Sequence, residues 1–313
     1  MRGFRRACAL ALAIGAGLGS LPARAQVEPP ILVEKVKNGE LPPMAERLPL
    51  TPRVTNLVEM GREPGIPGGE IRMLMADQRD LRIMSVYGYS RLMVFNLKQE
   101  LEPDILEDIQ IEDGRRFTLV LREGHRWSDG TPFTSEDFRY WWEDVANNPR
   151  LSPGGPPLAM LSGGQPPVFE VLDNRRVRYS WNQPHPSFLP AMAGAQPTYI
   201  FLPAHYLRRF HERYVEGAEL QANVRVHRLK DWTALHEQKA RLYRNENPEL
   251  PTLEPWRNVT PPPAERFVFE RNPFSTASMR TASNCPISTA SSSIRPPIRS
   301  FRQRLARATP ISR

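Results

Sequence analysis

The sequence predicts an α/β fold with a substantial share of antiparallel sheet. Two hairpins are predicted, each a pair of short apolar segments around a polar turn. They are Ile109–Ile111 with Phe117–Leu121, and Val168–Leu172 with Val177–Trp181. In the first, Asp113-Gly114 supplies the positive-φ residues that a tight turn between strands needs. Helical stretches interleave with these strands without a repeated βαβ period or any internal repeat. That combination is typical of a mixed α/β domain.

The strongest helix signal covers Thr134 to about Asn147. Thr134 is the expected N-cap, and Asp137 three residues later completes a variant of the capping box. The apolar stripe follows the helical spacing i, i+3, i+4, i+7 and is expected to face a core. It consists of Phe138, Trp141, Trp142 and Val145.

Three further elements are predicted around these. Glu70–Met75 alternates like a strand after Gly68-Gly69, a helix-like stretch covers Arg91–Lys98, and a second helix begins at Asp231. Among 313 residues there are 33 prolines. Because proline breaks interior helical hydrogen bonds, this proportion excludes a long coiled coil or an all-helical bundle.

The formal charge of +8 lies at the two ends of the chain. Residues 1–25 carry four Arg and residues 275–313 carry seven Arg, with no acid in either segment. Removing these eleven positive charges from +8 leaves −3 for residues 26–274. The predicted globular part is therefore mildly acidic, so a nucleic-acid partner is not expected.

The first 25 residues have the pattern of a secretory signal peptide. Arg2, Arg5 and Arg6 precede an apolar run, and Ala23-Arg24-Ala25 fits an A-x-A cleavage site before Gln26. We expect cleavage between Ala25 and Gln26 and export to the periplasm. The alternative is a buried N-terminal helix. The basic residues at the N-terminus and the small residues at the cleavage site disfavour it.

No catalytic or metal constellation is predicted, and no cofactor. His236-Glu237 and His211-Glu212 each begin like a zinc-protease helix, but Ala240 and Val215 stand where the second histidine is needed. Residues 26–274 hold no cysteine, so neither a disulfide nor a thiolate site is expected there. An exported hydrolase remains the alternative from the enzyme class.

Aromatic residues are the candidate ligand-binding groups. Tyr87 and Tyr89 flank Gly88 in a segment that reads as a loop after a strand, and aromatic walls are typical of ligand pockets. Both are therefore cleft candidates. Trp141 and Trp142 lie on the predicted helical stripe, and for them a core position is the favoured interpretation.

Residues Leu121–Phe138 closely resemble the signature of family 5 extracellular solute-binding proteins, the dipeptide- and oligopeptide-type receptors of bacterial ABC importers. The matching positions, interpreted as structural, are Trp127, Ser128, Asp129, Gly130, Pro132, Phe133, Thr134 and Asp137. Gly69–Arg72, Leu101–Glu107 and Phe267–Phe274 also resemble family segments. The resemblance implies the N-terminal part of a large, type II periplasmic binding protein-like fold. It further implies capture of a peptide or similar small solute for the permease subunits of an ABC transporter, without cofactor or catalysis.

Two departures from the family shape the predicted organisation. The resemblance ends near Phe274, and family members run well beyond 313 residues, so the lobe is expected to be truncated. We expect a signal peptide over 1–25, an extended proline-rich lead-in over 26–68, and an incomplete lobe over 69–274. Residues 275–313 are rich in Ser, Arg, Ala and Thr without acids, which predicts disorder.

We interpret this tail as the product of a changed reading frame. With synonymous codons chosen to suit, residues 275–292 read one base earlier as Phe-His-Arg-Val-Asp-Glu-Asn-Gly-Ile-Glu-Leu-Pro-Tyr-Ile-Asp-Ser-Val-Val. That reading resembles how the family continues after Arg271-Asn272-Pro273. The alternative to a working receptor is therefore a non-functional, frameshifted fragment of one.

Overall fold

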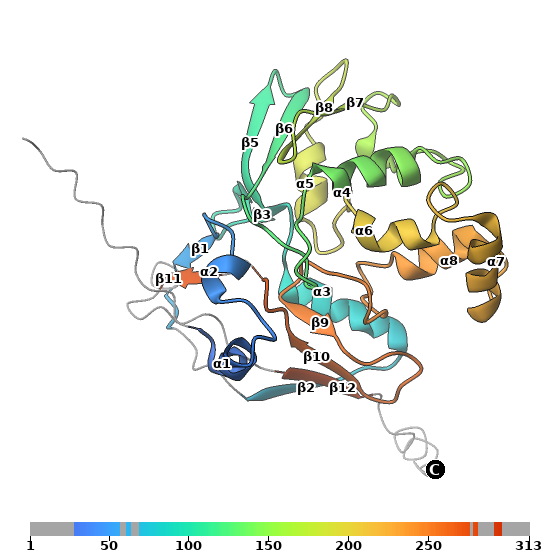
Figure 1. Ribbon diagram of the computed structural model, residues 1–313. Coiled ribbons are helices and arrows are strands. Elements are labelled where there is room, and N and C mark those ends of the chain that lie inside the picture. Colours follow the sequence, from blue (N-terminus) through green and yellow to red (C-terminus); the bar gives the residue numbers. More distant parts are fainter. Residues whose placement is uncertain (1–27, 57–60, 64–68, 276–277, 281–290, 296–313) are drawn as a thin grey trace, which may run out of the picture.

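The computed structural model describes residues 28–56, 61–63, 69–275, 278–280 and 291–295 (Figure 1). The predicted cleavage site, Ala25 and Gln26, lies outside these residues. Helices and strands interleave along the chain, and most strand pairs are antiparallel. The predicted mixed α/β class with hairpins is confirmed. Within the described residues, no helix combines the length and the apolarity needed to cross a bilayer.

Both predicted hairpins form and join into one four-stranded antiparallel sheet. Its strands, in spatial order, are β5 (Leu106–Glu112), β6 (Arg116–Leu121), β8 (Arg176–Ser180) and β7 (Val168–Val171). Asp113 and Gly114 have φ of 53° and 63° in the β5–β6 turn, as the Asp-Gly pattern predicts. The inner face carries Phe117, Leu119 and Tyr179, all buried.

A second four-stranded sheet is mixed. Its order is β2 (Glu70–Leu74), β12 (Ser291–Arg295), β10 (Phe267–Arg271) and β9 (Trp256–Asn258). Strand β12 runs parallel to β2 and antiparallel to β10. The composition-based expectation of disorder after Ser275 is therefore wrong for two short segments: β12 and β11 (Ser278–Arg280). Neighbouring strands offer backbone hydrogen bonds that composition does not reveal.

The lead-in is more structured than the predicted extended segment. It contains α1 (Pro30–Lys37), α2 (Met44–Arg47) and β1 (Val54–Asn56), which pairs with β11. Arg47 is buried, donates to the carbonyl oxygens of Pro42 and Pro273, and forms an ion pair with Glu28. These bonds attach the lead-in to the end of β10, and Figure 1 shows α1 and α2 beside that sheet.

The predicted helix after Thr134 begins as expected and then changes type. The Thr134 hydroxyl accepts from the Glu136 N–H, and the Asp137 carboxylate accepts from the Thr134 N–H. Helix α4 (Ser135–Arg139) continues into the π-helical η2 (Tyr140–Ala146). Because a π-turn is wider than an α-turn, the buried face rotates. Tyr140 and Asp144 are buried together with Phe138 and Trp141, whereas Trp142 and Val145 are only half-buried.

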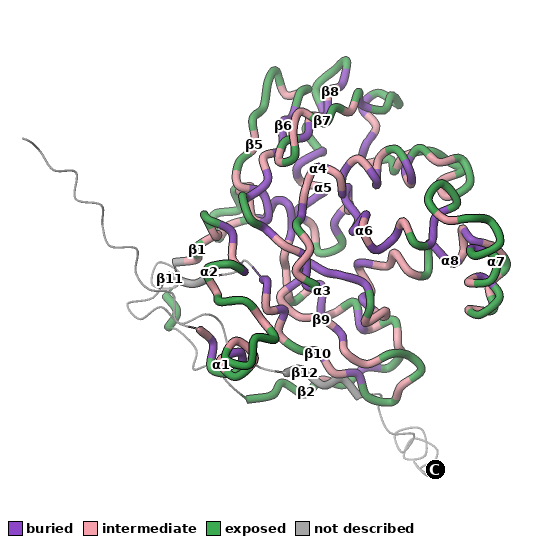
Figure 2. The backbone as a smooth tube through the Cα atoms, in the orientation of Figure 1, coloured by how far each residue is buried: buried purple, intermediate pink, exposed green. Residues whose placement is uncertain are grey.

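Helix α5 (Phe188–Ala193) packs on the inner face of the hairpin sheet, where Phe188 contacts Phe117 and Tyr179. The main core also includes residues of the other helices that follow: η3 (Leu158–Met160), α6 (Ala204–Leu207), η4 (Arg208–Phe210), α7 (Gly217–Val226) and α8 (Trp232–Lys239). As predicted, α8 follows Asp231, whose carboxylate accepts from the Ala234 N–H at 2.9 Å. The main apolar core lies between these helices and the sheet (Figure 2).

A smaller core lies under the mixed sheet. It contains Met75, Leu81, Met84, Phe267 and Phe269. Leu81 lies in η1 (Gln78–Arg82) and Met84 in α3 (Ile83–Gly88).

The predicted helix at Arg91–Lys98 is wrong. That stretch contains strand β3 (Met93–Phe95), paired with β4 (Leu101–Pro103). Leu92, Met93 and Val94 are all buried. A short run buried on both faces has no period that separates a strand from a helix.

The N-cap of α4 gives a first testable prediction. Replacing Thr134 by Ala removes the oxygen that accepts the Glu136 N–H, and we expect a loss of about 1 kcal/mol in the free energy of unfolding. Thr134→Ser keeps that oxygen and is the matched control. Urea unfolding followed by circular dichroism measures both. Equal stability of the two variants would show that the cap contributes nothing.

Candidate functional site

The segment with the family-like signature wraps around a buried tryptophan. Trp127 is fully buried, and its indole N–H donates to the Asp137 carboxylate at 3.1 Å. Its ring centroid lies 5.4 Å from that of Phe133 and 5.9 Å from that of Phe201. These three aromatic rings fix the signature segment against the main core.

Asp137 joins three separate backbone regions. Besides the indole, its carboxylate accepts from the N–H groups of Thr134 and Ala204, each at 3.0 Å. Burial raises the pKa of Asp137 to about 6, while the three donated hydrogen bonds lower it. The signature turn, the start of α4 and the start of α6 therefore meet at one carboxylate.

The turn at Asp129-Gly130 is held from both sides. Gly130 has φ of +89°, and a Cβ there would lie 3.0 Å from the ring of Phe274, so both backbone and space require glycine. The Asp129 carboxylate accepts from the Thr131 N–H at 3.0 Å and pairs with Nε2 of His205 at 2.7 Å. These bonds hold the pKa of Asp129 below its usual value, although its partial burial acts in the other direction.

The remaining signature residues also make internal contacts. The Ser128 hydroxyl accepts from the Thr252 N–H at 3.0 Å. Phe133 is buried, whereas Pro132 is exposed at the surface of the turn. The structure thus brings the two signature ends together around Trp127 and leaves the tip of the turn, Asp129 to Pro132, at the surface.

The two candidate tyrosines lie at the C-terminal end of α3, not in a loop. Tyr87 is in the last turn of the helix, and its side chain is 67 % exposed. Tyr89 is the C-cap in the left-handed region, with φ of 43°. Its hydroxyl donates to the Ala193 carbonyl at 2.9 Å, and the Arg91 guanidinium lies 5.5 Å from its ring centroid. Tyr89 is therefore tied into the fold, whereas the Tyr87 side chain lies exposed.

A buried ion pair that sequence reasoning missed lies beneath these tyrosines. Arg91 and Glu254 are both buried and 2.7 Å apart. Burial raises the pKa of Glu254 although Arg91 lowers it, and Oε2 of Glu254 has no hydrogen-bond partner. A Cβ on Gly88 would lie 2.6 Å from that oxygen. The two charged residues are 163 positions apart, so no local pattern could have paired them.

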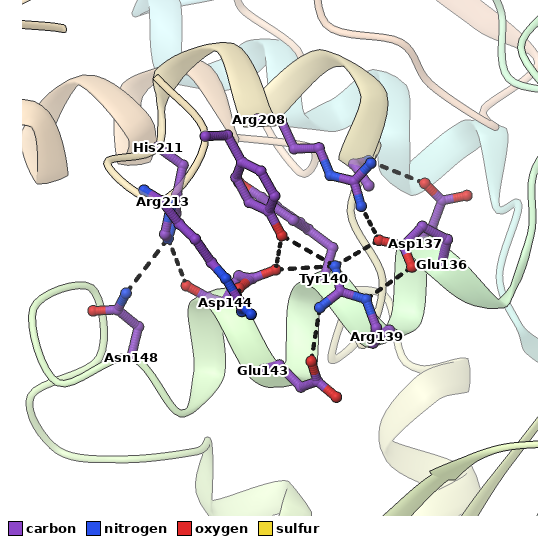
Figure 3. Close-up of polar contacts among 12 residues, drawn as sticks. Glu136, Asp137, Arg139, Tyr140, Glu143, Asp144, Asn148, Arg208, His211 and Arg213 are labelled. Carbon is purple, nitrogen blue, oxygen red and sulfur yellow. Dashed lines mark hydrogen bonds and ion pairs between the residues drawn. The ribbon is translucent and has the colours of Figure 1, made fainter. Parts of the chain in front are cut away.

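A polar cluster on α4 and η2 is the part of the structure that most resembles catalytic machinery (Figure 3). The buried Asp144 carboxylate is bonded to Arg139, Arg213 and Tyr214. His211 Nε2 lies 2.9 Å from the Asp144 carbonyl oxygen. The bonds to Arg and Tyr hold the pKa of Asp144 below its usual value despite its burial. The two arginines and the tyrosine therefore hold this carboxylate in ion pairs and a hydrogen bond.

The two histidines that begin zinc-like motifs are not arranged for a metal. His236 is buried, its Nε2 lies 2.7 Å from the Tyr140 hydroxyl, and burial lowers its pKa to about 3. His211 faces it with ring centroids 5.8 Å apart. Within the described residues, no group of three or more His, Cys, Asp or Glu side chains is placed to hold a metal ion.

Comparison with known proteins places the chain in a family. Residues 100–274 match the profile described as "Bacterial extracellular solute-binding proteins, family 5 Middle". The chain belongs to this solute-binding family. It is similar to the periplasmic alpha-galactoside-binding protein of Rhizobium meliloti, with 28 % identity over 274 residues. It is also similar to the periplasmic oligopeptide-binding protein OppA of Salmonella typhimurium, with 24 % identity over 156 residues.

Solved structures show the same fold. An oligopeptide-binding protein OppA superposes with a TM-score of 0.75 at 28 % identity over 87 % of this chain. The periplasmic binding protein MelB of Agrobacterium fabrum, solved with stachyose, gives a TM-score of 0.67 at 23 % identity over 91 % of this chain. The predicted periplasmic binding protein-like fold is confirmed.

The chain spans well under half the length of these relatives. It covers 36 % of the alpha-galactoside-binding protein and 28 % of OppA of Salmonella typhimurium. It covers 41 % and 43 % of the two solved chains. The family resemblance read from Leu121–Phe138 is thus confirmed for the part that this chain shares with its relatives.

Asp137 gives the second testable prediction. Asp137→Asn replaces an oxygen acceptor by an amide that faces N–H donors, and we expect a loss of about 2 kcal/mol in the free energy of unfolding at pH 7. The exposed Asp108→Asn is the matched control and should change stability by less than about 0.5 kcal/mol.

The difference in free energy of unfolding between wild type and Asp137→Asn should depend on pH in a definite direction. The pKa of Asp137 is raised in the folded state, so native Asp137 binds its proton before the unfolded chain does. The pH-dependent part of its contribution to stability is fully present below the unfolded pKa and is lost as pH rises through about 6, whereas the hydrogen bonds from its three N–H donors remain at pH 7. The gap between wild type and Asp137→Asn should widen as pH falls from about 6 towards 4. A gap that narrows over that range would contradict the assignment.

Proposed function

We propose that the chain is the ligand-binding component of an ABC importer that works in the periplasm. The match of residues 100–274 to family 5, on a fold shared with OppA, carries this proposal. Relatives described as periplasmic binding proteins support the location, and the signal-peptide pattern of residues 1–25 supports export with cleavage between Ala25 and Gln26. The expected partners are the permease subunits of the transporter.

Tyr87 is the proposed ligand contact on this lobe. An aromatic side chain that is 67 % exposed at a helix end leaves apolar surface in water, and covering it with a ligand is favourable. Its neighbour Tyr89 is bonded to Ala193 and fixes the helix end from which Tyr87 projects. We propose that Tyr89 acts only by holding this helix end in place.

The proposed ligand is a peptide or a comparable small solute such as an oligosaccharide. Relatives named for oligopeptides and for alpha-galactosides support both chemistries. Both kinds of solute present flat or extended faces that pack on an aromatic ring. No bond is broken in this function. Two lobes close around the ligand by a hinge motion, and release to the permease follows reopening.

Tyr87→Ala tests this contact in a protein whose reading frame is restored after Phe274 and which therefore contains both lobes. We expect the affinity for the bound solute to fall about tenfold, because burying an aromatic side chain contributes about 1.5–3 kcal/mol. Isothermal titration calorimetry with a tripeptide and with raffinose distinguishes the two ligand classes. Val226→Ala, an exposed apolar residue at the end of α7, is the control. Unchanged affinity in Tyr87→Ala would refute the contact.

The alternative is that this chain is a frameshifted fragment of such a receptor, and strand β12 favours it. Residues Ser291–Arg295 occupy a central position between β2 and β10. In the shifted reading, the family-like Tyr-Ile-Asp-Ser-Val-Val ends at positions 291 and 292, where this strand begins. Valine is enriched in strands. Two valines at the start of this strand therefore support the shifted reading.

Sequencing the gene across codons 270–280 tests the frame. We expect one base to be missing before the codon of Ser275, and restoring it should give a chain that binds solute measurably while the given chain binds negligibly. A ligand held by one lobe loses the burial of most of its surface, which is typically over about 70 % in such sites. Tight binding by the given 313 residues would contradict the proposal.

A further inference from the structure

A buried arginine joins the ends of two helices beneath the proposed ligand contact. The guanidinium of Arg91 donates to the carbonyl oxygen of Ser85, in the last turn of α3, at 2.6 Å. It also donates to the carbonyl oxygens of Gly194 and Ala195, which follow α5, at 3.4 and 3.3 Å. A cation is favoured at the C-terminal end of a helix, because the last carbonyl groups there carry negative partial charge. Arg91 thus fixes the end of α3 relative to the end of α5.

Glu254 holds this arginine from the side of the mixed sheet. Its Oε1 accepts from Nη1 of Arg91 at 2.7 Å, and both side chains are buried. The backbone carbonyl of Glu254 accepts from the side chain of Asn272, directly after β10, at 2.9 Å. A hydrogen bond between two charged groups is stronger than a neutral one and adds geometric specificity. The position of the α3 end is therefore coupled to the mixed sheet as well.

Gly88 brings α3 directly against the Glu254 carboxylate. It is the last residue of α3, and a Cβ added there would lie 2.6 Å from Oε2 of Glu254 and 3.1 Å from Cδ of Pro255. The carboxylate cannot turn away freely, because its side chain is buried and its Oε1 is bonded to Arg91. The position of the carboxylate and the end of α3 are therefore mutually fixed. Tyr87 is the residue directly before Gly88, so its direction depends on this contact.

We propose that Arg91 and Glu254 are positioning residues for solute binding, which act by fixing the end of α3 from which Tyr87 projects. This role rests on the proposed function, because it takes Tyr87 as the contact with the solute. The two charged side chains are 1 % and 5 % exposed, whereas Tyr87 is 67 % exposed, so they act through the helix end and not by touching the solute. A gap of about 0.5–1 Å at an apolar contact already loses about a quarter to a half of its dispersion energy. Small displacements of the helix end should therefore weaken binding.

Gly88→Ala tests the positioning without removing a charge. Alanine favours a helix over glycine, so a looser helix end in this variant would come from the clash with Glu254. The N–H of Tyr89 donates to the Ser85 carbonyl at 3.3 Å, and we expect its hydrogen exchange in the given chain to become about tenfold faster, as measured by NMR. Gly217→Ala at the start of α7 is the matched control, because a Cβ there meets no atom within 4 Å. It should leave the exchange rate of Tyr89 unchanged.

The effect on binding is measured in the protein whose reading frame is restored after Phe274, by calorimetric titration with a tripeptide and with raffinose. We expect Gly88→Ala and Glu254→Gln each to lower the affinity for the bound solute about fivefold, because residues in one contact network are energetically coupled. Glu254→Gln keeps an oxygen acceptor for Arg91 and removes only the charge. In a Tyr87→Ala background, neither substitution should lower the affinity further, since the contact that they position is gone. Circular dichroism confirms that each variant is folded.

The outcomes separate positioning of the contact from a general effect on the fold. Equal losses of affinity with and without Tyr87 would mean that the substitutions disturb the whole lobe, and would overturn the positioning role. Unchanged exchange at Tyr89 in Gly88→Ala would overturn it as well. If Tyr87→Ala weakens binding while Gly88→Ala and Glu254→Gln do not, the ligand contact stands and the positioning role is refuted. If the frame-restored wild type binds neither solute, the proposed function fails, and the positioning role fails with it.

Discussion

The buried carboxylate of Asp137 is the interaction on which the arrangement of this lobe depends. It accepts from the indole of Trp127, from the N–H of Thr134 and from the N–H of Ala204. Buried N–H groups without an acceptor are costly, so these donors fix where the signature turn, α4 and α6 lie relative to one another. Both carboxylate oxygens of Asp137 accept hydrogen bonds from these donors. This requirement explains an aspartate at this position better than the capping box alone does.

A second constraint joins segments that are distant in sequence. Phe274 packs on Gly130 so closely that a Cβ would reach 3.0 Å from its ring. One residue earlier, the Pro273 carbonyl accepts from Arg47 of the lead-in. The signature turn, the end of β10 and the lead-in therefore meet at one corner, around a cavity of about 760 Å³. Motifs recognised separately in the sequence thus form one structural unit.

Local signals in the sequence were enough for part of this fold. The Asp113-Gly114 turn, the cap at Thr134 and the start of α8 were predictable because turn and cap chemistry acts within a few residues. The rest depends on distant contacts. The buried Arg91–Glu254 pair spans 163 positions, and the π-helical turns of η2 bury Tyr140 and Asp144 against the predicted stripe. The segment Val86–Ser90 is predicted to be a loop after a strand, yet it contains the end of α3, where Gly88 lets the backbone pass Glu254.

Strand β12 is another element that depends on contacts distant in sequence. Composition predicts disorder after Ser275, but β2 and β10 leave a central position between them, and Ser291–Arg295 fills it. A central strand gains hydrogen bonds on both edges whatever its side chains, whereas its sequence decides how well its faces pack. The backbone position of β12 is thus determined by the neighbouring strands, which lie far from it in the sequence. The serine-rich composition of this segment gives no signal of the pairing, because the hydrogen bonds come from its two neighbours in the sheet.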